Sequence, residues 1–149
     1  MKWEKYNDEQ LIIGDVIEIS SKIVDTEIVT PFIKHVGIVV FVNDELQIAH
    51  NPYGGRPEII TLNKFLGPVR TIERIFHTNQ ANEEILKRYD ECKNTDYKFF
   101  KFNCEDFVSC VCDCYIGQDQ RKWYFGITIT LIIVGSIIGV LIYLINKTK

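Results

Sequence analysis

The chain has 149 residues, a formal net charge of −3 and 46% hydrophobic residues. Two of its 17 lysines and arginines, Lys147 and Lys149, lie in the C-terminal tail, so residues 1–122 carry 15 basic and 20 acidic side chains, a net charge near −5. An acidic surface disfavours nucleic acid as a partner and gives no electrostatic attraction to anionic lipid. Residues 1–122 are enough for one domain with a single core and too few for two.

The first half of the chain is predicted to form strands. Its first strand, Val16 to Ile19, follows Gly14-Asp15, and the nearly continuous apolar run from Val36 to Val42 is typical of a strand buried on both faces. The pair Asn43-Asp44 predicts a turn. Further strands are expected at Leu46 to Ala49, Glu58 to Leu62 and Val69 to Phe76.

Helices are predicted in the second half. Asn82 can cap a helix that runs through Tyr89, and Asn103 can cap a second helix from Cys104 to about Tyr115. Strands followed by helices indicate an α+β fold, with an antiparallel sheet packed against the helix that carries Cys104.

The C-terminal segment is predicted to cross a membrane. The 23 residues from Trp123 to Ile145 contain no charge and are long enough to span a hydrocarbon layer of about 30 Å at about 1.5 Å per residue. Because no apolar signal segment opens the chain, we expect the domain on the cytoplasmic side of this anchor. The expected organisation is a domain at 1–122, a transmembrane helix at 123–145 and a short basic tail at 146–149.

The five cysteines are an odd number in a chain without a secretory signal, which argues for reduced thiols rather than a disulfide framework. The spacing of Cys110, Cys112 and Cys114 is not that of the usual structural zinc sites, so we expect no metal and no cofactor. We interpret these three as small helix residues rather than as palmitoylation sites.

Cys104 is placed in the first turn of a predicted helix. The unpaired backbone N–H groups and the dipole there favour a thiolate and can donate to an oxyanion. Glu105 and Asp106 oppose part of this effect, so strong activation needs a histidine. The cysteine shares a helical stripe, expected to face the sheet, with Phe107, Val108, Val111 and Tyr115. A buried structural cysteine is the alternative interpretation.

Two histidines are predicted to lie side by side. If Asn43-Asp44 is the two-residue tip of a hairpin, the numbers of paired residues sum to 87, which places His50 opposite Gly37. His35 shares a face with Gly37, so the Cβ atoms of His35 and His50 are expected within about 7–8 Å. Both imidazoles can then converge on one thiol. A structural role for each histidine is the alternative.

These motifs resemble the lecithin retinol acyltransferase family. They are Gly14-Asp15-Val16-Ile17-Glu18-Ile19, His35-Val36-Gly37-Ile38-Val39-Val40, His50, and Asn103-Cys104-Glu105-Asp106-Phe107-Val108. The resemblance covers roughly residues 11 to 145. It implies a fold similar to a circularly permuted NlpC-type cysteine peptidase, and small phospholipase and acyltransferase members of the family also end in a hydrophobic anchor. The family usually has a histidine where this chain has Asp106.

Carried over to this chain, the resemblance implies that Cys104 is the nucleophile, His35 its base and His50 the group that orients His35. The expected activity is a thiol-dependent acyl hydrolase or acyltransferase that acts on lipid esters through an acyl-cysteine, with a lipid acyl donor and an unknown acceptor. A membrane-tethered cysteine peptidase or amidase is one alternative. A catalytically inactive, membrane-anchored interaction domain is the other.

Overall fold

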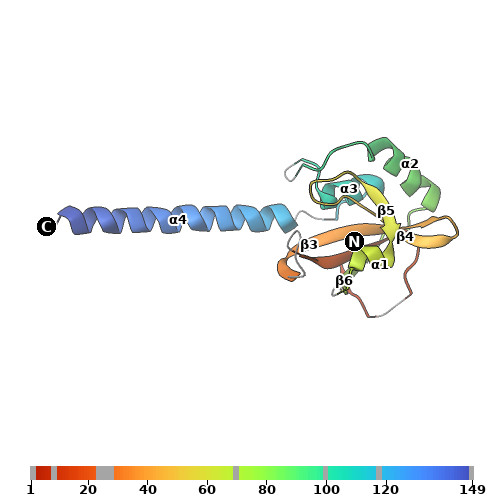
Figure 1. Ribbon diagram of the computed structural model, residues 1–149, viewed down its shortest axis with the longest axis horizontal. Coiled ribbons are helices and arrows are strands. Elements are labelled where there is room, and N and C mark those ends of the chain that lie inside the picture. The colour runs from red at the N-terminus through yellow and green to blue at the C-terminus, as the bar shows by residue number, and fades with distance from the viewer. Residues whose placement is uncertain are drawn as a thin grey trace. The chain divides into compact units, whose positions relative to one another are not determined.

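A computed structural model describes residues 3–7, 10–22, 29–68, 71–98, 101–116 and 119–147. The chain forms two compact units, Met1–Gly117 and Gln118–Lys149 (Figure 1). The strands are β1 (Glu4–Lys5), β2 (Asp15–Lys22), β3 (Val29–Val42), β4 (Glu45–His50), β5 (Glu58–Thr61) and β6 (Ile72–His77). The helices are α1 (Leu62–Leu66), α2 (Asn82–Cys92), α3 (Cys104–Val111) and α4 (Asp119–Lys147).

The first unit contains one six-stranded sheet in the order β1-β6-β2-β3-β4-β5, and every pair of neighbouring strands is antiparallel. The predicted α+β class with an antiparallel sheet is therefore confirmed. β3 is the longest strand and is hydrogen-bonded to β2 on one side and to β4 on the other. Its side chains alternate between two separate apolar clusters.

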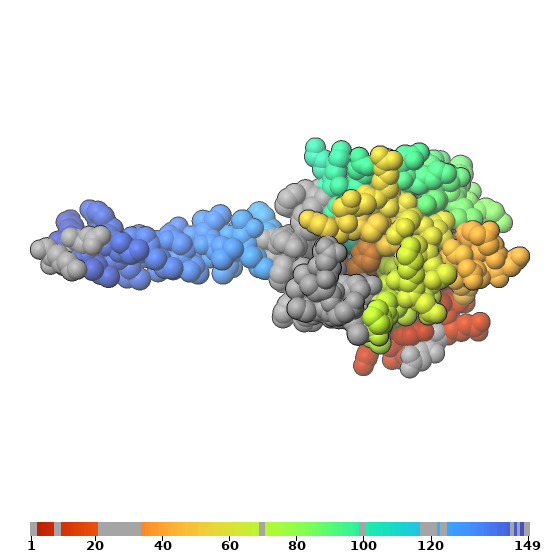
Figure 2. Space-filling model, viewed as in Figure 1, coloured from red at the N-terminus to blue at the C-terminus, as the bar shows by residue number. Residues whose placement is uncertain are grey.

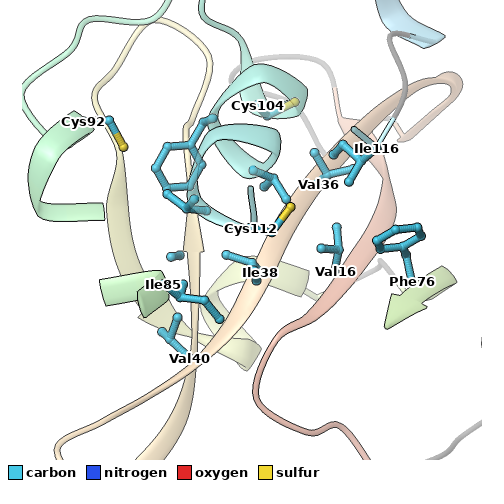
Figure 3. Close-up of a cluster of buried hydrophobic side chains, with 14 residues drawn as sticks. Val16, Val36, Ile38, Val40, Phe76, Ile85, Cys92, Cys104, Cys112 and Ile116 are labelled. Carbon is cyan, nitrogen blue, oxygen red and sulfur yellow. The ribbon is translucent and has the colours of Figure 1, made fainter. Parts of the chain in front are cut away.

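One cluster lies between the sheet and the helices α2 and α3, which sit together on one side of the sheet (Figure 1). β3 contributes Val36, Ile38 and Val40 to it, and α3 contributes Cys104 and the residues that follow on the same stripe (Figure 3). The other cluster contains Val39 and is covered by Phe65 of α1. This is the alternation expected of a strand buried on both faces.

The β3–β4 hairpin has the predicted two-residue tip. Asn43 and Asp44 both have positive φ, 54° and 63°, as the central residues of a type I′ turn require. Gly37 pairs with His50, so the predicted register is confirmed. Because side chains repeat every second residue, a slip of one position would have moved His50 to the other face.

Several element boundaries differ from the sequence predictions. β3 begins at Val29, well before the predicted start at Val36. β5 ends at Thr61, whose side chain accepts a hydrogen bond from the backbone N–H of Lys64 and caps the unpredicted helix α1. β6 begins at Ile72, and the start of the strand predicted from Val69 lies outside the described residues.

Both helix predictions need correction at one end. Asn82 does not cap α2 but is its first residue, because its side-chain amide bonds the backbone N–H and C=O of Phe41 at 2.8 and 2.9 Å. α3 ends at Val111 and not near Tyr115. Asp113 has a φ of 48°, which breaks the helix, and Tyr115 is exposed rather than part of the buried stripe.

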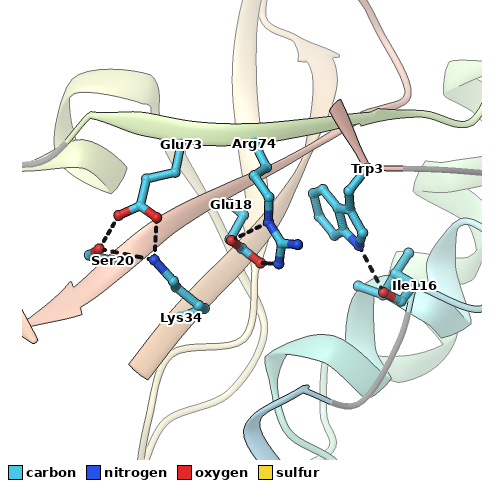
Figure 4. Close-up of polar contacts among 7 residues, drawn as sticks. All are labelled: Trp3, Glu18, Ser20, Lys34, Glu73, Arg74 and Ile116. Atoms are coloured by element: carbon cyan, nitrogen blue, oxygen red, sulfur yellow. Dashed lines mark hydrogen bonds and ion pairs between the residues drawn. The ribbon is translucent and has the colours of Figure 1, made fainter. Parts of the chain in front are cut away.

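The N-terminal segment is held by a polar cluster at the β6 side of the sheet (Figure 4). Buried Glu18 accepts two hydrogen bonds from the guanidinium of Arg74, at 2.7 and 2.5 Å. The Arg74 guanidinium lies 5.0 Å from the centre of a Trp3 ring, and Trp3 Nε1 donates to the carbonyl of Ile116 at 3.1 Å. Trp3 therefore joins the start of the domain to its last described residue.

The second unit is the long apolar helix α4. Its segment Phe125–Tyr143 has 19 residues and a mean hydropathy of 2.6, and no part of it is buried. It is long and apolar enough to span a membrane. Trp123 and Tyr124 are aromatic residues of the kind that favours membrane interfaces, and their side chains lie outside the described residues.

Deletion of residues 123–149 is expected to move the protein from the membrane fraction to the soluble fraction, because the division after Gly117 leaves the apolar cores of the domain intact. Membrane flotation and circular dichroism of the truncated chain measure both points. A folded domain that still floats with membranes would show that another surface binds lipid.

Candidate active site

His35 and His50 form a hydrogen-bonded pair. His35 Nε2 lies 2.8 Å from His50 Nδ1, and the two rings meet edge to face. His50 Nε2 lies 3.2 Å from Oε1 of Glu58, which stands opposite His50 in the β4–β5 pairing. The structure thus brings together the two histidines predicted to be neighbours. It adds Glu58, which sequence reasoning missed because the β4–β5 register could not be counted across the loop between them.

This row of groups determines which nitrogens carry protons. A carboxylate only accepts hydrogen bonds, so Glu58 requires a proton on His50 Nε2. His50 Nδ1 is then an acceptor for the proton on His35 Nε2. When both rings are neutral, the basic lone pair of His35 is therefore on Nδ1. His50 is buried and His35 is half-buried, so solvent competes little for the bond between them.

Phe65 of α1 holds both imidazoles in place. Its ring centroid lies 5.4 Å from that of His35 and 5.3 Å from that of His50. Gly37 makes room for this packing, because a Cβ there would lie 3.1 Å from Phe65 Cε2 and 2.4 Å from Ile48 Cγ2. A glycine is thus required at position 37, because Ile48 and Phe65 leave no room for a side chain.

Cys104 is the first residue of α3 and is only 1% exposed. Asn103 caps the helix as predicted, since its side chain accepts from the backbone N–H groups of Glu105 and Asp106 at 2.9 and 3.0 Å. Asp106 Oδ2 accepts from the backbone N–H of Asn103 at 3.0 Å and completes a capping box. Asp106 therefore has a structural reason to occupy this position.

The cap corrects one sequence expectation. The first backbone N–H groups of the helix were expected to be available to an oxyanion, but those of Glu105 and Asp106 are taken by Asn103. What the helix start still provides is the positive end of its dipole, next to the first residue, Cys104.

The imidazole rings and Cys104 come from different elements, the β3–β4 hairpin and the start of α3. The rings contact Phe65 in the α1 cluster, whereas Cys104 belongs to the cluster under α3 (Figure 3). The hairpin and the segment before α3 are joined where β4 ends. Asn51, directly after His50, donates from Nδ2 to the carbonyl of Phe102 at 3.1 Å, two residues before Cys104.

The loop that follows His50 comprises residues 51–57. It lies against the segment that leads to α3, as the adjoining yellow and green-blue surfaces in Figure 2 show. The backbone N–H of Tyr97 donates to the carbonyl of Gly55 at 2.9 Å, and the rings of Tyr53 and Tyr97 are 5.3 Å apart. The loops that flank His50 and Cys104 are therefore tied to each other.

Two of the other four cysteines differ in state from the prediction. Cys112 and Cys114 are joined in a disulfide, so the expectation of reduced thiols is wrong for this pair. Burial, followed by the neighbouring Cys110 thiol, raises the pKa of Cys92 to about 12. Cys92 is therefore protonated and unreactive at neutral pH. Cys110 is exposed and is not disulfide-bonded.

His77 is partly exposed, and its Nδ1 lies 2.7 Å from Oδ1 of buried Asp15. Within the described ranges, no group of three or more His, Cys, Asp or Glu side chains is arranged to hold a metal ion.

No protein-family model, curated protein or solved structure matches the chain.

Substitution Gly37→Ala is expected to lower the free energy of unfolding by about 1–3 kcal/mol, because the new methyl group must displace Ile48 and Phe65. Urea denaturation followed by tryptophan fluorescence measures the change. In the double mutant Gly37→Ala/Ile48→Ala the losses should not add, since removal of Ile48 Cγ2 relieves the closest contact. Additive losses would show that Gly37 is not constrained by packing.

Proposed function

We propose that this chain is a membrane-anchored cysteine enzyme that transfers or hydrolyses acyl groups of lipid esters through an acyl-cysteine on Cys104. The observation that carries the proposal is the hydrogen-bonded row Glu58, His50 and His35, which leaves a basic Nδ1 on His35. His50, the middle residue of this row, is the last residue of β4, and the next residue, Asn51, is hydrogen-bonded to Phe102 just before α3. The motif resemblance to the lecithin retinol acyltransferase family supports the roles of Cys104, His35 and His50.

In the first step His35 Nδ1 takes the proton of the Cys104 thiol, and the sulfur attacks the carbonyl carbon of the ester. The positive end of the α3 dipole stabilises the oxyanion of the tetrahedral intermediate. The carbon–oxygen bond then breaks, and protonated His35 gives its proton to the leaving alcohol. His50, held by Glu58, stabilises the charged form of His35 while it carries that proton.

In the second step the O–H or N–H group of an acceptor gives its proton to His35 and attacks the thioester. The bond from the acyl carbon to sulfur breaks, and the Cys104 thiolate recovers the proton from His35. Water as acceptor gives hydrolysis, and an alcohol or amine gives acyl transfer. The apolar helix α4 supports a lipid substrate, because a tethered site works at high effective concentration on the membrane that holds it.

Replacement Cys104→Ala is expected to abolish acyl transfer and labelling by a thiol-reactive acyl probe, because it removes the nucleophile. The full chain in detergent should keep its circular dichroism spectrum. Cys110→Ala, which removes an exposed thiol outside the site, serves as the matched control and should retain labelling and turnover. Turnover that survives in Cys104→Ala would remove the proposed mechanism.

Mass spectrometry of mixed phospholipid vesicles incubated with the full chain divides the remaining alternatives. Released fatty acid or acylated acceptor is expected with wild type and absent with Cys104→Ala. If the probe labels Cys104 but no lipid is cleaved, a peptide or amide substrate replaces the ester. If neither is seen, the chain is a catalytically inactive interaction domain.

His35→Ala is expected to lower turnover by a factor of about 10² to 10⁴, because it removes the base. His50→Gln keeps a hydrogen-bonding group next to His35 and should cost less. In the double mutant the two losses should not multiply, since the residues act as one unit.

The same variants can be followed by the rate of iodoacetamide alkylation across neutral pH in the Cys110→Ala background. There the reaction reports Cys104, because Cys92 is protonated and Cys112 and Cys114 are disulfide-bonded when no reductant is added. Equal rates in the presence and absence of the His35 side chain would mean that another group activates the thiol.

A further inference from the structure

Asn51 is completely buried and follows His50 at the end of β4. Its Nδ2 donates to the carbonyl of Phe102, a residue 51 positions later in the chain. The same carbonyl accepts a second bond, at 3.0 Å, from the backbone N–H of Lys98. Phe102 immediately precedes the helix cap Asn103, so one buried side chain joins the strand end that carries a histidine to the helix start that carries the cysteine.

The other ties between these loops are of a different kind. The ion pair between Arg56 and Asp96 has a length of 2.7 Å, but both side chains are more than half exposed, so its contribution is small. The hydroxyl of Tyr89 donates to the carbonyl of Pro57 at 3.3 Å, several residues away from His50. Asn51 alone among these contacts lies next to the candidate site residues.

The amide oxygen of Asn51, Oδ1, indicates that this side chain is not present only to stabilise the fold. Its Oδ1 is buried and has no hydrogen-bond partner among the described residues. A buried polar atom without a partner is destabilising, and in native proteins such atoms call for an explanation. Rotating the amide would only place Oδ1 against the Phe102 carbonyl, so the donor orientation of Nδ2 is the favourable one.

We propose that Asn51 is a positioning residue of the acyl-transfer site, which holds the start of α3 in register with the His35–His50 pair through its bond to Phe102. The inference rests on the proposed function for its chemistry and on the burial and bonding of Asn51 for its geometry. A misplacement of about 1 Å between reacting groups is enough to lower a rate about 10²-fold, whereas the fold needs no such accuracy.

The test uses the full chain in detergent, in the Cys110→Ala background, with Asn51→Leu and Asn51→Asp. Both variants keep the approximate size of the side chain and remove the Nδ2 donor, and Asn51→Leu leaves no hydrogen-bonding group at this position. Arg56→Ala is the matched control, because it cuts the exposed tie between the same two loops. Each variant is measured for its Tm, for kcat and KM on a water-soluble ester, and for the pH dependence of Cys104 alkylation.

Asn51→Leu is expected to melt within about 5 °C of wild type, whereas Asn51→Asp should melt lower because it buries a carboxyl group. Both variants are expected to lose about 10²-fold in kcat with little change in KM and to shift the alkylation profile toward that of His35→Ala. Arg56→Ala should behave as wild type. Wild-type kcat and an unchanged pH profile in a folded Asn51 variant would overturn the inference, as would loss of cooperative melting in both variants, which would make Asn51 a residue of the fold.

The outcome separates this inference from the proposed function. If wild type shows His35-dependent alkylation of Cys104 but cleaves no ester, the acyl-transfer proposal fails and the pH profile still decides the role of Asn51. If wild type and His35→Ala alkylate equally fast, there is no coupled pair to position, and this inference fails together with the role of His35 as the base.

Discussion

The pairing of Gly37 with His50 is the constraint on which the candidate site depends. It puts His35 and His50 diagonally on one face of the hairpin, within hydrogen-bonding distance. It also places Gly37, which has no side chain, where Phe65 packs against the two imidazole rings. The register in turn follows from the two-residue turn, since Asn43 and Asp44 tolerate the positive φ values that tighter hairpins need.

The start of α3 is fixed by an independent device, the capping box of Asn103 and Asp106. The cap determines that Cys104 is the first helical residue. The backbone N–H groups of Glu105 and Asp106 donate to the Asn103 side chain and are not available to a substrate. The environment of the sulfur is thus set by the helix dipole and by two acids that oppose it. A thiol in this setting needs a base for activation, which agrees with a histidine whose basic nitrogen is determined by its neighbours.

Local sequence signals predicted the parts that local chemistry determines. The Asn43-Asp44 turn, the register that follows from it and the Asn103 cap were all predictable because each depends on residues a few positions apart. The parts that failed depend on distant partners. Asn82 has the right type for a cap, but Phe41 offers its amide two better bonds. Glu58 and the Asn51–Phe102 bond depend on how loops meet, which no periodicity encodes.

The bond from Trp3 to Ile116 limits the reach of the domain on its tether. Ile116 is held to the domain, so only residues 117–124 separate it from the apolar segment that begins at Phe125. Even fully extended, eight residues span no more than about 28 Å, at about 3.5 Å each. If α4 spans a membrane, as proposed, so short a connection would restrict the proposed enzyme to substrates of the membrane that holds it.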